Sequence, residues 1–401
     1  MSPETIRIGL EARLLGGAMT GIGNYSFHLL RSLITAYPEL QFLAYGLRSW
    51  SPLTASTLQQ IEDSQGIPST GAGDPLRQAI RFLRTASYRR LARFQLAQSI
   101  YRLNFFRTVR LQPINLFHAF NYLPLADPGV PTLPVVYDLS FVRFPQFHPA
   151  DRLKALERLP RLVDQSPLIQ TISQFSRNEI AAYYGIDQNR IFVATPAASH
   201  IFRPLGPEAT RRDLDRLDVL PGRYLLTVGT LEPRKNLRTL VSAYAQIPKP
   251  TRQRVSLIVV GGAGWGELEL PPGTAVLQSE GTLRFLGTVS NRELRSLYEG
   301  AVGLLYPSVY EGFGMPVVEA MACGTQVVHS ADTSMDEISN GLATRVSAND
   351  VDAWRDAIAD LIAAPAKTRD KVERLIAQAA TFSWSSSAGA VRKAYADLLD
   401  H

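Results

Sequence analysis

The sequence predicts an α/β protein with two domains, each built on a parallel sheet. Two observations lead to this prediction. An apolar strand pattern, a glycine-bearing turn and a helical pattern follow one another over residues 5–37, and the alternation of strands and helices restarts at residue 223. At 401 residues the chain is long enough for two domains of ordinary size. Because parallel strands are joined by crossover helices, repeated units of this kind imply sheets that are covered by helices on both faces.

The first domain is expected to occupy residues 1–200. Residues 5–15, TIRIGLEARLL, form an apolar run and are predicted to be a buried parallel strand. After the glycines of the following turn, a helical pattern places four apolar side chains on one side: Tyr25, Leu29, Leu30 and Leu33. A strand, a glycine turn and a helix in this order begin a Rossmann-like unit.

Later strands of this domain are predicted from the apolar runs at 40–46, 114–120, 132–141 and 190–198. Residues 168–185, LIQTISQFSRNEIAAYYG, are predicted to form a strand and then a helix. Ser173 or Ser176 would cap this helix, and Glu179 would lie in its first turn.

The second domain is expected at residues 201–380, beginning with a polar, proline-bearing connection at 201–222. Its strands are predicted at YLLTV (224–228), VSLIVV (255–260), LRFLGTV (283–289), VGLLYPS (302–308) and TQVVHS (325–330). Helical patterns or glycine turns separate these strands. Two such domains that face each other create a cleft, which is the usual place for a ligand.

The composition is typical of a globular protein, because 45% of the residues are hydrophobic and 19% are charged. No apolar run reaches about eighteen residues, so no transmembrane helix is predicted. The first residues lack the basic start and the uninterrupted apolar stretch of a secretory signal. The single cysteine, Cys323, excludes an internal disulfide and a cysteine-based zinc cluster and fits a reducing compartment. We therefore expect a cytoplasmic protein.

Basic residues are concentrated in residues 76–112, whereas the whole chain has a net charge of +6. The segment contains nine arginines and no acidic residue, and large apolar residues such as Leu83, Leu96 and Phe106 lie between the arginines. A helix of this composition can lie on an anionic lipid surface, here the inner face of the cytoplasmic membrane. The alternative is a solvated helical face that contacts acidic groups elsewhere in the fold. Arginine without clustered lysine or stacking motifs does not support nucleic acid as a partner.

The first candidate site is the stretch GTLEPRKNL at 229–237, which follows the predicted strand YLLTV. It would lie at the carboxyl edge of the second sheet, outside which the ligands of open α/β sheets bind. Arg234 and Lys235 are adjacent cations near a helix start, where backbone N–H groups also favour an anion. A diphosphate needs such neutralisation when no divalent metal is bound. A solvated Arg-Lys pair at a helix start is the alternative.

The second candidate site is the stretch SVYEGFGMPVVEAMACG, in which Glu311 and Glu319 stand eight positions apart. Gly312 and Gly314 have no Cβ atom and would let the backbone approach a ligand closely. Pro316 suits the first turn of a helix, and Glu319 is expected in the same turn. Carboxylates accept hydrogen bonds from vicinal sugar hydroxyls, so the pair indicates a hydroxyl-rich ligand. Two solvated surface charges are the alternative.

Four stretches of the C-terminal half resemble retaining glycosyltransferases of family four (glycosyl transferases group one), which have the GT-B fold: GTLEPRKNL, VVGGAGWG, LRFLGTVSNRELRSLYEGA and YPSVYEGFGMPVVEAMACGT. The N-terminal stretches EARLLGGAMTGIGNYSFHLL and LIQTISQFSRNEI are also similar to that family. The tail FSWSSSAGAVRKAYADLL looks like the family's final helix, which implies that residues 381–401 cross back to the N-terminal domain. EARLLGG and YDLSFVRFPQFHP look most like bacterial mannosyl- and rhamnosyltransferases of surface-polysaccharide assembly.

The resemblance implies that a nucleotide-sugar donor binds to these motifs. Arg234 and Lys235 would hold the donor diphosphate and stabilise the departing nucleotide. Glu319, the second glutamate of the family's E-x7-E motif, would hold the ribose hydroxyls, and Glu311, the first, would lie beside the transferred sugar. Further implied donor contacts are Gly21 and Gly23 in the N-terminal glycine loop, and Gly229, Gly262, Val289, Gly312, Phe313, Gly314 and Met315. No metal or cofactor is expected. The acidic residues at 350–352 are interpreted as the start of a helix and not as metal ligands.

One position departs from the family pattern. Many relatives have His-Asp at the end of the strand that is written VVYDLSF here, whereas this chain has Tyr137 and Asp138. Tyrosine can donate a hydrogen bond, but it does not titrate near neutral pH as histidine does. Asp138 and His118 are candidate catalytic residues, and His118 can face the cleft from the end of a neighbouring strand. A structural histidine is the alternative for His118.

The activity that the resemblance implies is transfer of a hexose, with retention, from a nucleotide-diphosphate sugar to a glycan or lipid-linked acceptor. GDP-mannose is the preferred donor. Attack is expected from the front face with the donor phosphate as the base, so neither a protein nucleophile nor a metal is required. A catalytically inactive scaffold that binds sugar or lipid and a nucleotide-sugar epimerase are the alternatives. A dinucleotide-dependent oxidoreductase is disfavoured, because neither GGAGWG nor GIGNYS matches G-x-G-x-x-G.

Overall fold

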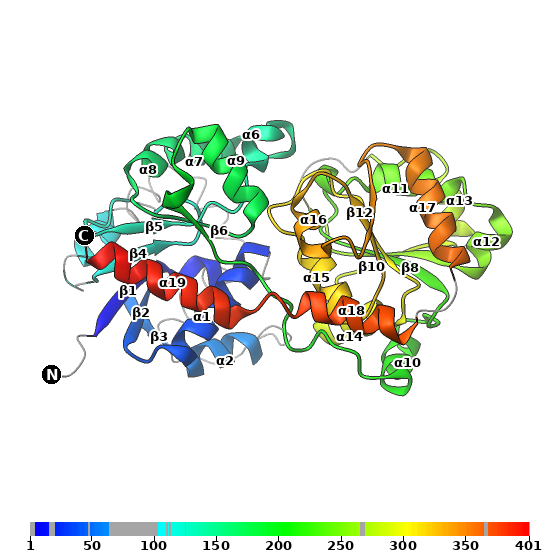
Figure 1. Cartoon of the computed structure of the whole chain (residues 1–401), viewed down its shortest axis with the longest axis horizontal. Helices are drawn as coiled ribbons and strands as arrows, with labels where there is room; N and C mark the ends of the chain where they lie inside the picture. The colour runs from blue at the N-terminus through cyan, green and yellow to red at the C-terminus, as the bar shows by residue number, and fades with distance from the viewer. Residues whose placement is uncertain are drawn as a thin grey trace.

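The structure is a computed structural model that describes residues 5–15, 21–46, 49–63, 103–109, 111, 114–124, 126–264, 269–364 and 368–400. Two α/β domains lie side by side, and the end of the chain returns to the N-terminal one (Figure 1). Each domain contains its own, largely parallel sheet. The predicted two-domain α/β fold is therefore confirmed.

The N-terminal domain contains a five-stranded sheet with the order β3-β2-β1-β4-β5. Its strands are β1 (Ile6–Glu11), β2 (Leu40–Tyr45), β3 (Trp50–Leu53), β4 (Leu116–Ala119) and β5 (Thr132–Pro134). Neighbouring strands are parallel except for β2 and β3, which form an antiparallel edge that was not predicted. A separate parallel pair, β6 (Ile169–Thr171) and β7 (Ile191–Val193), is joined to this sheet by a bridge between Val135 and Gln170.

Three predicted strands of this domain end well before the expected residue, and one of them, predicted over 190–198, stops at Val193 as β7. The strand predicted over 5–15 stops at Glu11, and the chain continues as the 3-10 helix η1 (Ala12–Leu15). The strand predicted over 132–141 stops at β5, and helix α6 (Ser140–Arg143) occupies its last positions. Ala12 and Leu139 are buried in the core nevertheless. The apolar character of these residues therefore reports burial and not strand conformation, which a short apolar run cannot distinguish.

Helix α1 (Gly21–Ala36) buries the predicted face of Tyr25, Leu29, Leu30 and Leu33. The other described helices of this domain are α2 (Ala55–Asp63), a segment at 103–109, α6, η3 (Pro145–Phe147), α7 (Ala150–Leu156), α8 (Leu159–Gln165), α9 (Gln174–Tyr184) and η4 (Gln188–Arg190).

Ser173 caps α9, because its side chain accepts a hydrogen bond from the backbone N–H of Ser176 at 3.0 Å. This hydrogen bond decides between the two predicted caps. Glu179 lies in the second turn of α9 and not in the first, since the helix begins at Gln174. The prediction for Glu179 is therefore wrong by about one turn.

The C-terminal domain contains a six-stranded parallel sheet with the order β10-β9-β8-β11-β12-β13. Its strands are β8 (Tyr224–Val228), β9 (Ser256–Val260), β10 (Leu283–Gly287), β11 (Leu304–Tyr306), β12 (Val327–Ser330) and β13 (Thr344–Val346). The first five were predicted. The side chains of β8, β9, β11 and β12 are buried along nearly the whole length of each strand, as expected when helices cover both faces.

The helices of this domain are α10 (Pro207–Asp215), η5 (Pro233–Lys235), α11 (Leu237–Ala245), α12 (Lys249–Arg254), α13 (Thr274–Ser279), α14 (Asn291–Gly300), α15 (Met315–Ala322), α16 (Ser334–Ser339), α17 (Val351–Ala363) and α18 (Arg369–Ala379). Asp350 caps α17, as predicted for this acidic stretch. In the described part of the chain, no helix has the length and hydrophobicity that crossing a membrane requires.

The predicted connection at 201–222 contains α10 and belongs to the C-terminal domain. Arg295 of α14 is almost fully buried and pairs with Asp213 of α10 at 3.1 Å and with Glu299 at 2.7 Å. A buried charge is strongly unfavourable unless it is paired. This ion network therefore fixes α10 to α14.

The last helix, α19 (Trp384–Leu399), lies along α1 of the N-terminal domain (Figure 1). The Ser387 hydroxyl donates to the Thr195 carbonyl at 2.6 Å, which ties the start of the helix to the end of the N-terminal half. The implied crossing of the C-terminal helix to the first domain is confirmed.

Candidate active site at the domain junction

The site lies at the carboxyl edge of the C-terminal sheet, where the parallel neighbours β8 and β11 end. After β8 the chain forms η5, which carries Arg234 and Lys235. After β11 it forms a loop that carries Glu311 and then enters α15. Because adjacent parallel strands end at the same edge, the two predicted motifs meet there.

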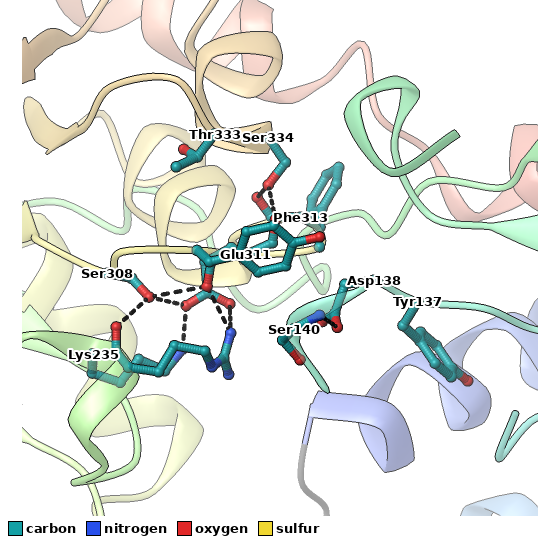
Figure 2. Close-up of polar contacts among 12 residues, drawn as sticks. Tyr137, Asp138, Ser140, Lys235, Ser308, Glu311, Phe313, Thr333 and Ser334 are labelled. Carbon is teal, nitrogen blue, oxygen red and sulfur yellow. Dashed lines mark hydrogen bonds and ion pairs between the residues drawn. The ribbon is translucent and has the colours of Figure 1, made fainter. Parts of the chain in front are cut away.

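Arg234, Lys235 and Glu311 form one buried ion cluster, part of which is labelled in Figure 2. The Lys235 Nζ donates to Oε1 of Glu311 at 2.5 Å, and Nη1 of Arg234 donates to Oε2 at 2.9 Å. Arg234 also donates to Glu232 at 2.8 Å, and the Ser308 hydroxyl donates to Glu311 at 2.6 Å. The side chain of Arg234 is 15% exposed and that of Glu311 is 10% exposed, so the alternative of solvated surface charges is wrong.

The Glu311 carboxylate is a weak base in these surroundings. Burial alone would raise its pKa, but the charges of Arg234 and Lys235, with hydrogen bonds from Lys235 and Ser308, outweigh burial and lower the pKa to about 2. Burial also disfavours the cation of Arg234, yet the two nearby glutamates raise its pKa above the usual value. Glu311 and Arg234 therefore remain ionised throughout the physiological pH range.

The formal charges of the cluster cancel, because two cations face the two carboxylates of Glu232 and Glu311. A diphosphate that approached the cations would compete with Glu311 for the same N–H donors. Backbone N–H groups at the start of α15 offer further stabilisation for an anion, since Gly314 is its N-cap and no side chain caps the helix. Gly314 has a φ of 117°, a conformation that favours glycine.

Glu319 has a different environment from Glu311. It lies one position beyond the first turn of α15, later than predicted, because the helix begins at Met315. The Tyr298 hydroxyl donates to its Oε2 atom at 2.9 Å. Burial raises the pKa of Glu319 to about 8, although this hydrogen bond lowers it. At pH 7 Glu319 is therefore mainly protonated, whereas Glu311 is ionised.

The N-terminal domain contributes Tyr137 and Asp138 to the opposite side of the junction (Figure 2). A Cβ atom at Gly312 would lie 2.6 Å from the Tyr137 carbonyl oxygen and 3.0 Å from Cβ of Asp138, so only glycine fits there. The Asp138 carboxylate accepts a hydrogen bond from the backbone N–H of Ser140 at 2.9 Å. The Tyr137 hydroxyl donates to the Phe120 carbonyl at 2.7 Å and points away from Glu311. The structure thus brings Asp138 to the site, but not the Tyr137 phenol.

His118 does not face this site, and its assignment there is wrong. It is fully buried on β4, and its Nδ1 atom lies 2.6 Å from the Tyr395 hydroxyl of α19. Its ring stacks on Phe120 with centroids 3.7 Å apart. Burial lowers the pKa of His118 to about 3, so the ring is neutral. The return of α19 over β4 places the histidine in the core, which sequence alone did not indicate.

The two N-terminal glycines lie in a helix and not in a loop. Gly21 and Gly23 belong to the first turn of α1, and residues 16–20 of the predicted loop lie outside the described residues. A Cβ atom at Gly21 would meet no other atom within 4 Å, whereas Gly23 is buried.

The remaining predicted donor contacts fall into two groups. Gly229 and Gly262 lie at the carboxyl ends of β8 and β9, and the Lys235 stem packs against Gly229. Val289 and Met315 are partly buried against the core. Phe313 is buried and packs edge-on against Phe382 with centroids 5.4 Å apart, so its side chain belongs to the core.

Several residues that contact the site were not predicted: Glu232, Tyr298, Tyr306 and Ser308. The Tyr306 hydroxyl donates to Glu311 at 3.0 Å and accepts from Lys235 at 2.9 Å. Glu232 and Ser308 lie within the two motifs, so their short sequence distance from the predicted residues could have indicated that they contact the site. Tyr298 reaches Glu319 from α14, and no local pattern indicates that contact.

Comparison with known proteins identifies the family. Residues 218–381 match the family model described as Glycosyl transferases group 1. A relative from Escherichia coli, named O-antigen chain mannosyltransferase B, is 34% identical over 386 residues, which are 94% of this chain and 96% of the relative. A sucrose-phosphate synthase from Thermosynechococcus elongatus has a TM-score of 0.69 at 19% identity and covers 98% of this chain and 99% of its own. Anabaena Alr3699/HepE in complex with UDP-glucose has a TM-score of 0.65 at 16% identity and covers 98% of this chain and 99% of its own. The chain belongs to the glycosyl transferases group 1 family and is a glycosyltransferase with the GT-B fold.

Proposed function

We propose that the protein is a retaining mannosyltransferase that moves mannose from GDP-mannose to a glycan or lipid-linked acceptor in surface-polysaccharide synthesis. The full-length similarity to the relative named O-antigen chain mannosyltransferase B supports the sugar and the type of acceptor. The observation that carries the proposal is the buried cluster of Arg234, Lys235 and Glu311 at the carboxyl edge of the second sheet. It offers cations to a diphosphate and a carboxylate to the neighbouring sugar.

In this proposal Arg234 and Lys235 bind the donor diphosphate and stabilise the charge that develops on the departing GDP. Both side chains are held at the edge of the sheet before the donor arrives, and the diphosphate would replace Glu311 as the acceptor of part of their hydrogen bonds. Glu319 accepts hydrogen bonds from the ribose hydroxyls. The binding of UDP-glucose by the Anabaena protein of the same fold supports a donor of this class.

The surroundings of Glu311 support front-face attack with retention. A carboxylate with a pKa of about 2, which accepts hydrogen bonds from Arg234, Lys235, Tyr306 and Ser308, is a poor base and a poor nucleophile. A double-displacement mechanism, in which Glu311 would form a covalent glycosyl-enzyme intermediate, is therefore unfavourable. The donor phosphate remains the group that can take the proton of the acceptor hydroxyl, while Glu311 stabilises the positive charge on the sugar ring.

Neutralisation of the diphosphate by side chains and amide groups leads us to propose that transfer requires no metal. We expect the rate of mannose transfer to be unchanged, within about twofold, when EDTA is added to the purified protein. Loss of transfer in EDTA and its recovery with Mg²⁺ would contradict this part of the proposal.

The protonation of Glu319 predicts that GDP binding depends on pH. Ribose hydroxyls that donate to Glu319 favour its ionised form, whereas the pKa of about 8 keeps it mainly protonated at pH 7. Binding should therefore release a proton below about pH 8, and affinity should rise with pH and level off above that value. Calorimetry in two buffers that differ in ionisation enthalpy measures this release. The Glu319→Gln variant corrects for protons lost by GDP itself, and equal release by both proteins would contradict the assignment.

Two alternatives predict different products. An inactive scaffold would bind GDP but release no free sugar or glycan product, and an epimerase would change the donor without an acceptor. Intact Arg234, Lys235, Glu311 and Glu319 favour a transferase over a scaffold.

The deciding experiment combines a ligand screen with a transfer assay. We expect GDP to raise the unfolding midpoint more than UDP or dTDP, because a ligand that binds the folded state stabilises it. We then expect mannose from GDP-mannose to be linked to a mannose-terminated oligosaccharide, with the α-configuration kept in the product by NMR. A β-linked product would contradict retention, and transfer only from UDP-glucose would contradict the sugar.

The described part of the arginine-rich segment supports contact with a membrane. Residues 103–109 are helical, and Phe105 and Val109 of this helix pack into the N-terminal domain. The outer side exposes Leu103 by 61% and Phe106 by 44%. Apolar side chains that are exposed beside arginines suit the headgroup region of an anionic bilayer. The rest of residues 76–112, apart from Leu111, lies outside the described residues.

We expect the double variant Leu103→Ser, Phe106→Ser to sediment severalfold less with anionic liposomes than the unaltered protein, because it loses buried apolar area. Leu220→Ser is the matched control, since Leu220 is also 61% exposed but lies on the other domain. Higher salt should weaken the binding of the unaltered protein. Equal binding to neutral liposomes would contradict an electrostatic contact.

A further inference from the structure

The residues on both sides of Glu311 contact the N-terminal domain, although Glu311 itself pairs with cations of the C-terminal domain. The Tyr310 hydroxyl donates to the Glu179 carboxylate of α9 and accepts a hydrogen bond from the backbone N–H of Leu139 at 3.0 Å. The Tyr310 ring is buried and packs between Phe144 and Phe175 of that domain, with centroid distances of 5.7 Å and 5.9 Å.

Gly312 is the second point of attachment. The Ser176 hydroxyl of α9 lies 3.2 Å from the Gly312 carbonyl oxygen and 3.0 Å from the Tyr137 carbonyl oxygen, so it bridges the two domains. Gly312 approaches Asp138 so closely that no side chain fits at residue 312 while the domains remain in contact.

Helix α9 receives one more contact from the C-terminal domain. The two carboxylate oxygens of Glu337, in α16, accept hydrogen bonds from the backbone N–H groups of Gln174 and Phe175, each at 3.0 Å. Both groups belong to the first turn of α9, where a carboxylate is favoured. The same helix thus binds α16 and both neighbours of Glu311.

The Tyr310 backbone also contacts the ion cluster, because its carbonyl oxygen accepts a hydrogen bond from Nη1 of Arg234 at 2.8 Å. The same Nη1 atom donates to Glu311. A shift of residue 310 that follows separation of the domains would therefore move a hydrogen-bond partner of Arg234.

We propose that Tyr310 is a positioning residue that couples contact between the two domains to the placement of Glu311 and Arg234. When α9 and the 310–312 loop are in contact, the cluster is held in the arrangement described above. When the domains separate, the Tyr310 hydroxyl and the Gly312 carbonyl lose their partners, and the loop can relax to let the nucleotide enter or leave. The catalytic part of this inference rests on the proposed function, whereas the coupling itself does not.

The test compares Tyr310→Phe, Glu179→Gln and the double variant. Tyr310→Phe removes the hydroxyl and Glu179→Gln removes the charge of its acceptor, and each change keeps the size of the side chain. We expect each to lower the turnover number for mannose transfer about tenfold but to weaken GDP binding by no more than about threefold. The smaller effect on binding is expected because Arg234 keeps its hydrogen bond to Glu232 within the C-terminal domain. The double variant should lose less than the sum of the two single losses, since each variant removes or weakens the hydrogen bond from Tyr310 to Glu179. Glu179→Gln also loses the ion pair of Glu179 with Arg143 at 3.0 Å.

Domain contact is measured separately, by energy transfer between dyes on Gln59→Cys and Gln253→Cys, two exposed positions on α2 and α12. Tyr310→Phe should lengthen the mean distance between the dyes. Tyr224→Phe is the matched control, because its hydroxyl donates to the Leu297 carbonyl at 2.7 Å within the C-terminal domain. That variant should change neither the distance nor the turnover number.

Unchanged dye distance in Tyr310→Phe and Glu179→Gln, or fully additive losses of turnover, would overturn the coupling. If Tyr310→Phe fails to fold, Glu179→Gln in α9 gives the same test from the other domain. If the unaltered protein transfers no sugar at all, the proposed function fails, but a longer dye distance in both variants still supports the coupling.

Discussion

Replacing Glu311 by glutamine is expected to tighten GDP binding about threefold to tenfold while it lowers the turnover number about a hundredfold or more. The carboxylate accepts hydrogen bonds from Arg234 and Lys235 at 2.9 Å and 2.5 Å, and in the proposed function it competes with the donor diphosphate for these two cations. Its removal leaves both cations available to the nucleotide. The same change removes the negative charge that is proposed to stabilise the sugar ring as it becomes positive. Calorimetry of GDP and the rate of transfer from GDP-mannose measure the two effects.

Glu232→Gln is the matched control for the Glu311 variant. This variant also removes one of the two carboxylate charges that neighbour Arg234. Nη2 of Arg234 donates to Glu232 at 2.8 Å, whereas Nη1 donates to Glu311. We expect tighter GDP binding in this variant as well, but a much smaller loss of turnover. Weaker GDP binding in Glu311→Gln would show that the carboxylate does not compete with the diphosphate. A turnover number near that of the unaltered protein would remove Glu311 from the reaction.

Replacing Lys235 by alanine is expected to weaken GDP binding about 10- to 100-fold. One charge-assisted hydrogen bond to a phosphate contributes about 1.5–3 kcal/mol, and Lys235 is only 17% exposed, so solvent screens it little. Turnover should also fall, because the departing nucleotide loses one fixed cation. Isothermal titration with GDP and the transfer assay give both values.

Lys249→Ala is the control for loss of a lysine that lies outside the site. Its Nζ atom pairs with Glu280 at 2.9 Å, and its side chain is 56% exposed, so we expect no change in GDP affinity. If Lys235→Ala binds GDP as tightly as the unaltered protein, the diphosphate does not lie at this cation. The assignment of both Arg234 and Lys235 would then have to be withdrawn.

Much of the site could be predicted because its residues lie in short motifs at strand ends. GTLEPRKNL and the stretch from Ser308 to Glu319 each follow a strand of the same parallel sheet, and such strands end at one edge. The prediction that His118 faces the site was wrong for a different reason. A residue type at a strand end does not show whether a helix from another part of the chain covers it, as α19 covers His118.

Local sequence patterns were enough to predict the alternation of strands and helices, the two sheets and the loops that carry the ion cluster, because periodicity and turn residues act over a few neighbouring positions. The charge of each glutamate and the contact between the domains depend instead on how distant parts of the chain pack together. Glu311 and Glu319 are identical residues in one motif, but cations surround the first, whereas burial next to a tyrosine hydroxyl keeps the second mainly protonated. The hydrogen bond from Ser176 to Gly312 joins residues that are 136 positions apart in the sequence. Burial and charge pairing between such distant residues arise from tertiary packing, which no local pattern encodes.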